Sequence, residues 1–244
     1  MSLEKITSLH QLEQLRDKLR EERKARKNRV LICMTGCRAL GAKNVAEQFR
    51  KSLGATELKK QTEVVEVGCI GLCAQAPTIL IEPYDYLYGG VKPQDVDEII
   101  DTTLRHGKPV ERLAVPQNGK TEPEISKVDF YRKQNRFVLE NCGRIDPQKI
   151  EDAIERGTYI AAMKTIAAKQ PQQVIDEVTA SGLRGRGGAG FATGVKWNFC
   201  RKAAGEEKYI ICNADEGDPG AFMDRALLEG DPHRVIEGML IAAY

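Results

Sequence analysis

Two pairs of cysteines have the residue type and the spacing of a metal-binding site. Three residues separate Cys33 from Cys37, three separate Cys69 from Cys73, and each pair follows a short apolar run in a glycine-containing segment. Four thiolates on two loops can hold a 2Fe-2S cluster, in which each iron takes two cysteine sulfurs, or a tetrahedral zinc ion. The spacing weakly favours iron, since structural zinc usually takes cysteines two residues apart. Two alternatives stay open: buried thiols that share no ligand, and a redox dithiol, although a dithiol needs a two-residue spacing.

A glycine-rich run has the composition of a phosphate-binding loop. It satisfies the G-x-G-x-x-G pattern with Gly185, Arg186, Gly187, Gly188, Ala189 and Gly190. A Rossmann fingerprint would require a strand before this run, whereas residues 174–181 have a helical pattern, so that interpretation fails on context. The bare backbone still lets a phosphate approach closely. Residues 194–199 look like a helix start that directs N–H groups and Lys196 at an anion. A solvated lysine is the alternative for Lys196.

An acidic cluster follows the next apolar run. Residues 209–212 predict a buried strand, and the polar residues after it are Asn213, Asp215, Glu216 and Asp218. The carboxyl ends of strands are where α/β folds place ligand sites. Amide and carboxylate oxygens there can accept hydrogen bonds from flavin ring N–H groups or ribose hydroxyls. A solvated acidic turn is the alternative.

Composition and charge narrow the function classes. The chain has 244 residues, is 41% hydrophobic and carries a net charge of +2 from 37 basic and 35 acidic side chains. This length allows two domains, and the balanced charge predicts no attraction to nucleic acid or to a membrane surface. No run of about 18 apolar residues is present and the charged N-terminus lacks a signal-peptide core, so we expect a cytoplasmic protein. In a reducing compartment, paired cysteines indicate metal or redox chemistry.

The elements that position these residues alternate between helical and strand patterns. An amphipathic helix is predicted over residues 2–25, and the basic residues Lys24, Arg26, Lys27 and Arg29 are interpreted as its solvated end. Beyond it, strands are predicted over 30–32, 63–67, 78–81 and 84–88, with helices over 43–53 and 93–105. Residues 107–128 have little periodicity and read as a linker, and three short helices over 146–156, 161–169 and 171–181 precede the glycine-rich run. The expected fold class is α/β.

The first half of the chain resembles the thioredoxin-like 2Fe-2S ferredoxin domain. The resemblance covers residues 30–107, and within them the run Val67-Gly68-Cys69-Ile70-Gly71-Leu72-Cys73 closely matches the family's second ligand pair. The resemblance implies that Cys33, Cys37, Cys69 and Cys73 bind one 2Fe-2S cluster. The family generally spaces its first two ligands by four residues, whereas this chain leaves three.

The second half resembles the NADH- and FMN-binding subunit of respiratory complex I and its relatives in NAD-linked hydrogenases and formate dehydrogenases. The likeness lies in residues 182–197, 212–216 and 224–225, and the run 229–233 and the fused ferredoxin domain look like the soluble branch. It implies that residues 185–190 and Lys196 hold the FMN phosphate. It also implies that Asn213, Asp215 and Glu216 contact the flavin, that Phe191 and Phe199 flank the adenine of NADH, and that Asp218 faces the nicotinamide. Without the likeness, Phe191 and Phe199 would read as plain core residues.

The implied activity is that of an NADH dehydrogenase, or diaphorase, subunit. Hydride passes between NAD(H) and FMN, with Glu216 and Asp218 as the catalytic residues, and single electrons then pass to iron-sulfur clusters. The expected domains are an amphipathic helix (1–28), a ferredoxin domain (29–108), a linker (109–145) and an incomplete FMN/NADH-binding domain (146–244). A 4Fe-4S cluster is expected only beyond residue 244. The implied partners are iron-sulfur and catalytic subunits of a hydrogenase- or formate dehydrogenase-like complex. The alternative is a non-catalytic iron-sulfur carrier or assembly subunit, and a zinc-binding adaptor is a third.

Overall fold

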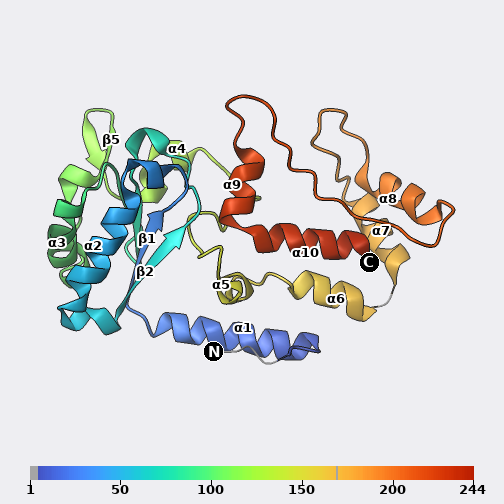
Figure 1. Cartoon of the computed structure of the whole chain (residues 1–244), viewed down its shortest axis with the longest axis horizontal. Helices are drawn as coiled ribbons and strands as arrows, with labels where there is room; N and C mark the ends of the chain where they lie inside the picture. Colours follow the sequence, from blue (N-terminus) through green and yellow to red (C-terminus); the bar gives the residue numbers. More distant parts are fainter. Residues whose placement is uncertain (1–4, 169) are drawn as a thin grey trace.

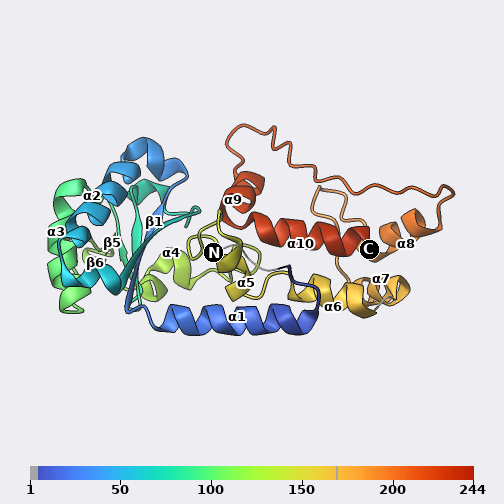
Figure 2. The same cartoon turned by 60° about the horizontal axis from the view of Figure 1, so that its bottom comes forward.

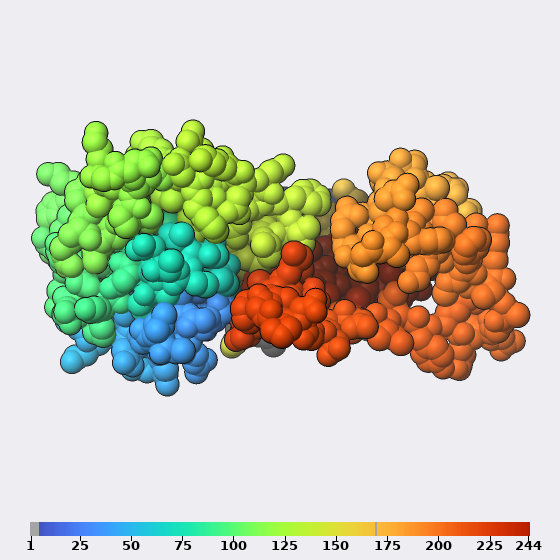
Figure 3. Space-filling view, turned by 90° about the horizontal axis from the view of Figure 1, so that it is seen from above, coloured from blue at the N-terminus to red at the C-terminus, as the bar shows by residue number. Residues whose placement is uncertain are grey.

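The computed structural model describes residues 5–168 and 170–244. The first predicted helical residues, 2–4, and the last residue of the helix predicted over 161–169 lie outside the described residues. The chain is elongated and has two lobes, one at each end of the view from above (Figure 3).

The first lobe is built on a four-stranded mixed sheet (Figure 1). Its strand order is β2-β1-β3-β4, with β1 parallel to β2 and antiparallel to β3, and β3 antiparallel to β4. All six residues of β1 are buried, because it is a central strand that is covered on both faces. The strands are β1 (Asn28–Cys33), β2 (Thr62–Val67), β3 (Ile79–Glu82) and β4 (Tyr86–Tyr88).

One face of the sheet is covered by helices α2 (Ala42–Gly54) and α3 (Val96–Ile99), the latter continued by a π-helical turn over Ile100–Arg105. Helix α2 buries residues three and four positions apart, which is the pattern of a helix that turns one face to a core. The helices predicted over 43–53 and 93–105 are confirmed, and so are the strands of the first lobe.

The other face is covered by the segment that was predicted to be a linker. It forms a hairpin of β5 (Val115–Gln117) and β6 (Lys120–Glu122) and a short helix, α4 (Asp129–Arg132). Val115, Ile125, Val128 and Tyr131 lie in one buried cluster with Leu31 of β1 and other sheet residues. The beginning of this segment is therefore part of the first lobe, and the domain limits stay a prediction.

The second lobe consists of helices in the part that the structure describes. They are α5 (Ile150–Glu155), α6 (Ile160–Ala168), α7 (Pro171–Ala180), α8 (Thr193–Lys202), α9 (Met223–Gly230) and α10 (Pro232–Ala243). The N-terminal helix α1 (Leu9–Lys24) runs from the first lobe along α5 and α6 (Figure 2). Ser8 caps it, since the Ser8 side chain accepts a hydrogen bond from the Gln11 N–H group.

The strand predicted over residues 209–212 is wrong. These residues lie in an extended segment without helix or strand, and the side chains of Tyr209 and Ile211 are 77% and 82% exposed. A strand is stabilised by hydrogen bonds to a neighbouring strand, and no described strand pairs with this segment. The mixed α/β class therefore rests on the first lobe.

Candidate cofactor sites

The two cysteine pairs meet at one edge of the sheet. Strands β1 and β2 are parallel and pair Cys33 with Val67, so the loops that follow both strands begin side by side. Cys37 lies in the short helical turn Gly36–Leu40 after β1, and Cys69 lies in the loop after β2. Cys33 and Cys37 are buried, Cys69 is half-buried and Cys73 is exposed.

The thiols of both pairs interact directly. The neighbouring Cys37 and Cys69 thiols lower the pKa of Cys33 to about 2. The pKa values of Cys37 and Cys69 are raised, because each interacts with Cys33 and is partly buried beside its charge. A three-residue spacing is thus enough to bring Cys37 to Cys33 when a tight helical turn connects them.

Polar groups surround these sulfurs. Thr35 Oγ1 lies 3.6 Å from Cys33 Sγ, Thr78 Oγ1 lies 3.7 Å from Cys37 Sγ, and the Gly71 N–H group donates to Cys69 Sγ at 3.2 Å. Hydrogen bonds to sulfur stabilise thiolates and tune the potential of an iron-sulfur cluster. The site therefore has the ligands and the surrounding donors that a cluster needs.

The residue types alone allow either of two metal centres. The four cysteines can supply two thiolates to each iron of a 2Fe-2S cluster or four thiolates to one tetrahedral zinc ion. Among the described residues, no group of three His, Cys, Asp or Glu side chains already lies close enough together to hold a single ion.

The glycine-rich run forms an open loop with a closed base. The Gly185 N–H group donates to the Phe191 carbonyl at 2.8 Å, and the Thr193 N–H group donates to the Leu183 carbonyl at 2.9 Å. In the described chain no protein acceptor is bonded to the N–H groups of residues 187–190, and Ala192 provides no side-chain cap for α8. Unpaired N–H groups beside a helix N-terminus form a place where an anion can bind.

The other predicted residues of this loop region face solvent. Lys196 is exposed, and Phe191 and Phe199 are 51% and 62% exposed, so the alternative that both rings are plain core is wrong for the described fold. Gly194 packs against Thr179 of α7, where an added Cβ would lie 2.7 Å from the Thr179 nitrogen. This contact sets the start of α8 next to α7.

The acidic cluster lies on the extended segment before α9. Glu216 accepts hydrogen bonds from the N–H groups of Asp224 (2.9 Å) and Arg225 (3.1 Å), and it thereby caps α9. Burial alone would raise the pKa of Glu216, but these backbone donors outweigh it and lower the pKa. Asn213, Asp215 and Asp218 are exposed.

No hydrogen bond or ion pair joins the acidic cluster to the glycine-rich loop among the described residues. A flavin held by these two segments alone would be open to solvent. The described chain therefore supplies binding groups for such a ligand without enclosing it.

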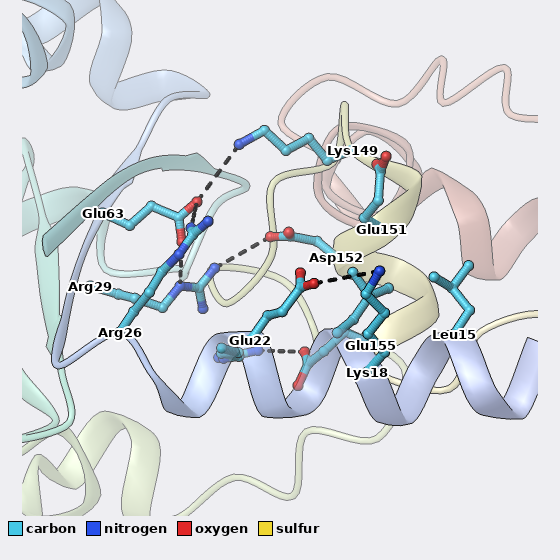
Figure 4. Close-up of a pocket in the computed structure, with 12 residues that line it drawn as sticks. Leu15, Lys18, Glu22, Arg26, Arg29, Glu63, Lys149, Glu151, Asp152 and Glu155 are labelled. Atoms are coloured by element: carbon cyan, nitrogen blue, oxygen red, sulfur yellow. Dashed lines mark hydrogen bonds and ion pairs between the residues drawn. The ribbon is translucent and has the colours of Figure 1, made fainter. Parts of the chain in front are cut away.

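A charged cavity of about 380 Å³ lies between α1, β1 and α5, and sequence reasoning missed it (Figure 4). The interpretation of Arg29 as part of a solvated helix end is wrong, because Arg29 is 5% exposed. Its guanidinium pairs with Glu82 at 3.2 Å, Asp152 at 3.3 Å and Glu63 at 3.4 Å. A run of basic residues in the sequence does not show which carboxylates from distant segments will pair with it in the fold. The ion pairs of the described residues that line this cavity join α1, β1, β2 and α5.

Two domain families match the chain. The thioredoxin-like 2Fe-2S ferredoxin family matches residues 18–104, and the Nuo51 FMN-binding domain family matches residues 178–244. The first match contains all four paired cysteines, and the second contains the glycine-rich loop and the acidic cluster.

Curated relatives match parts of the chain. The HndC subunit of the NADP-reducing hydrogenase of Solidesulfovibrio fructosivorans is 52% identical over 46% of this chain and 23% of its own length. The alpha subunit of the NAD-reducing hydrogenase HoxS of Cupriavidus necator is 36% identical over 78% of this chain and 30% of its own. An NADH-quinone oxidoreductase subunit of Aquifex aeolicus is 48% identical over 51% of this chain and 29% of its own. The chain spans less than a third of the length of each.

Proposed function

Since the chain belongs with the proteins that carry a thioredoxin-like 2Fe-2S ferredoxin domain and a Nuo51 FMN-binding domain, we propose that it is an NADH dehydrogenase (diaphorase) subunit. In this role it connects NAD(H), through FMN, to the iron-sulfur clusters of a larger oxidoreductase. The observation that supports the proposal is that parallel pairing of β1 and β2 brings the loops with Cys33, Cys37 and Cys69 to one edge of the sheet, on the same chain as the open N–H groups of the glycine-rich loop. The domain limits 29–108 and 146–244 belong to the proposal.

Each predicted residue has a role in this proposal. Cys33, Cys37, Cys69 and Cys73 hold the cluster, and the residues 185–190 hold the FMN phosphate against the N-terminus of α8. When bound, FMN accepts a hydride and releases electrons singly. The chain's own residues orient the ring through the oxygens of residues 213–216, while Glu216 also keeps α9 in place.

Lys196, Phe191, Phe199 and Asp218 complete the proposed nucleotide site. The exposed Lys196 ammonium adds charge near the phosphate, and the two exposed rings offer faces on which an adenine stacks. Asp218 faces the nicotinamide as an acceptor. Their exposure fits a site that receives a nucleotide from solution.

The proposed partners are further iron-sulfur and catalytic subunits of a hydrogenase- or formate dehydrogenase-like complex. The names of the relatives, two hydrogenase subunits and one quinone oxidoreductase subunit, support a multi-subunit setting. None of the described helices is both long and apolar enough to cross a membrane. A location in the cytoplasm is part of the proposal.

The second candidate is a non-catalytic iron-sulfur carrier or assembly subunit. The observation that favours it is the exposure of Asn213, Asp215 and Asp218 together with the lack of any described contact to residues 185–190. In this case the ferredoxin lobe works and the flavin segment binds nothing.

Cofactor analysis separates the candidates. The full-length subunit should contain iron, sulfide and FMN in stoichiometric amounts, and NADH should bleach both flavin and cluster absorbance. Iron and sulfide without FMN would support the carrier. Zinc in place of iron and sulfide would overturn both.

A further inference from the structure

The cluster loop touches helix α9 at a contact that only glycine allows. Gly68 directly precedes Cys69, and a Cβ on Gly68 would overlap the Gly230 Cα atom and lie 3.3 Å from the Gly230 nitrogen. Both partners at this point are backbone, which cannot rotate away as a side chain can. Figure 3 shows the α9 segment lying against the first lobe.

Residues 142 and 143 also pack against this contact. A Cβ on Gly230 would lie 2.6 Å from Cys142 Sγ, and a Cβ on Gly143 would overlap the Ile70 side chain, which follows Cys69. Cys142 is buried, and burial and the charge of Asp231 raise its pKa to about 11. We call the contact of Gly68, Cys142, Gly143 and Gly230 the glycine joint.

The residues that follow Gly230 make hydrogen bonds that hold the glycine joint in place. Asp231 is fully buried, accepts from the Asn141 side chain at 2.8 Å and caps α10 through the Arg234 N–H group. The Tyr159 hydroxyl and His233 Nδ1 lie 2.7 Å apart. The run 229–233 therefore contacts the cysteine loop through Gly230 and is held to residues 141 and 159 through Asp231 and His233.

Helix α9 has one end at each proposed cofactor segment. Glu216 of the acidic cluster caps its first turn, and Gly230 at its last residue touches the cluster loop. A helix is a stiff rod, so a shift at one end moves the other. The joint thus couples the position of Cys69 to that of residues 213–218.

We propose that Gly68 and Gly230 are positioning residues that hold the cysteine loop against α9 and so fix its placement relative to the flavin segment. The part concerning the flavin rests on the proposed function, whereas the joint itself does not. A side chain at Gly68 forces the cysteine loop and the end of α9 apart, and a side chain at Gly230 forces that end of α9 away from Cys142. Either shift opens the glycine joint and admits water to the cluster edge.

Substitutions in the full-length protein, reconstituted with iron and sulfide, test the joint. The variants are Gly68→Ala and Gly230→Ala. Gly54→Ala and Gly238→Ala are the matched controls, because an added Cβ at these positions meets nothing within 4 Å. Gly230 has no positive φ and ends a helix, so alanine is tolerated there by the backbone itself. Any effect of Gly230→Ala therefore reports the contact.

The first readout is amide hydrogen exchange in residues 68–71 and 226–231. We expect exchange about tenfold faster in both joint variants, because overpacking a tight contact favours its open form, and no change in the controls. The second readout is the cluster potential, which should rise. Water at the cluster edge favours the reduced form, since reduction adds negative charge to an anionic cluster.

A double variant gives the sharpest outcome. Cys142→Ala removes the Sγ atom that lies 2.6 Å from a Cβ on Gly230 and leaves only the Cβ atom at 3.2 Å, so it should restore most of the exchange protection and potential in Gly230→Ala. It should not restore Gly68→Ala, whose clash is with backbone. Unchanged exchange and potential in both single variants, or equal changes in Gly54→Ala, would overturn the proposal. So would a rescue of Gly68→Ala by Cys142→Ala. A protein that contains no FMN would contradict the proposed function. Hydrogen exchange and the cluster potential would still test the role of the glycine joint.

Discussion

One thiol organises the cysteine site. Cys33 ends a fully buried strand, and the neighbouring Cys37 and Cys69 thiols lower its pKa. Its position is set by the sheet, whereas Cys37 and Cys69 reach it from loops. The two cysteine pairs could be recognised in the sequence because residue type and spacing are local properties. The polar contacts of Thr35 and Thr78 could not be predicted, because nothing in the sequence distinguishes a threonine that faces a sulfur.

Replacing one buried ligand should remove the cluster. We expect Cys37→Ser to lose nearly all bound iron, because a serine hydroxyl does not ionise near neutral pH as a thiol does. The measurement is iron and sulfide content with the visible spectrum. Cys200→Ser is the control, since Cys200 is exposed and lies on α8. A Cys37→Ser protein with full iron content would contradict the assignment of this residue.

The buried guanidinium of Arg29 should matter far more than an exposed one. Arg29→Ala leaves Glu63, Glu82 and Asp152 without their shared partner, and breaking such a buried pair costs about 3–5 kcal/mol of unfolding free energy. Arg112 pairs with Asp95 but is 52% exposed, so Arg112→Ala should cost about 0–1 kcal/mol. Urea unfolding followed by circular dichroism measures both. Equal costs would show that the Arg29 network is not buried in solution.

Acid should weaken the same network with a defined sign. Burial alone would raise the pKa of Glu82, but Arg29 and then Arg23 outweigh it and lower the pKa. A carboxyl whose pKa is lowered by folding stabilises the fold above its unfolded value of about 4.3 and loses this effect as the pH falls below it. Asp152, whose pKa is raised by burial, acts in the opposite direction.

Glu82→Gln should therefore flatten the loss of stability on the acid side. The unfolding free energy of the variant should be lower than that of the wild type near pH 7 and should change less between about pH 5 and pH 3. Urea midpoints across this range measure it. A variant with the same acid slope as the wild type would assign the loss to other carboxyls.

At the scale of elements, the helices and strands that could be predicted are those whose apolar residues repeat regularly over a long stretch of sequence. Helix α2 repeats its buried residues over thirteen positions, so its period could be read. The segment with β5, β6 and α4 buries Val115, Ile125 and Val128 in pieces of three or four residues, which are too short to show a period. The apolar run 209–212 has a strand's composition but no described partner strand. Strand formation depends on such pairing, which a local pattern does not contain.

The contact between α7 and α8 gives a prediction at this scale. Gly194→Ala should destabilise the second lobe by about 1–3 kcal/mol, because its Cβ would press on the Thr179 backbone. Gly187→Ala is the control, since an added Cβ there meets nothing within 4 Å. Hydrogen exchange in residues 171–202 locates the effect. Equal hydrogen exchange in the two variants would contradict the close packing of α7 against α8.

At the scale of the whole molecule, helix α1 is one of the elements that join the two lobes. Helix α1 leads directly into the central strand of the first lobe, yet it lies along α5 and α6 of the second. The Arg20 guanidinium donates to the Glu155 carbonyl at 2.9 Å, and Arg23 pairs with both Glu155 and Glu82. The sequence predicted this helix as amphipathic but did not show which element its apolar face covers. Amphipathicity defines a face, and only the fold supplies its partner.

Leu12→Asp should therefore release α1 from α5 and α6 of the second lobe. Leu12 is 3% exposed, and an unpaired carboxylate in its place would be expelled to water together with α1. We expect hydrogen exchange to rise in α5 and α6 while the sheet of the first lobe keeps its protection. His10→Asp is the matched control, since it adds the same charge on an exposed position of the same helix. If exchange in α5 and α6 were the same in both variants, α1 would not be what covers them, and the two lobes would have to be joined by the glycine joint and the intervening chain.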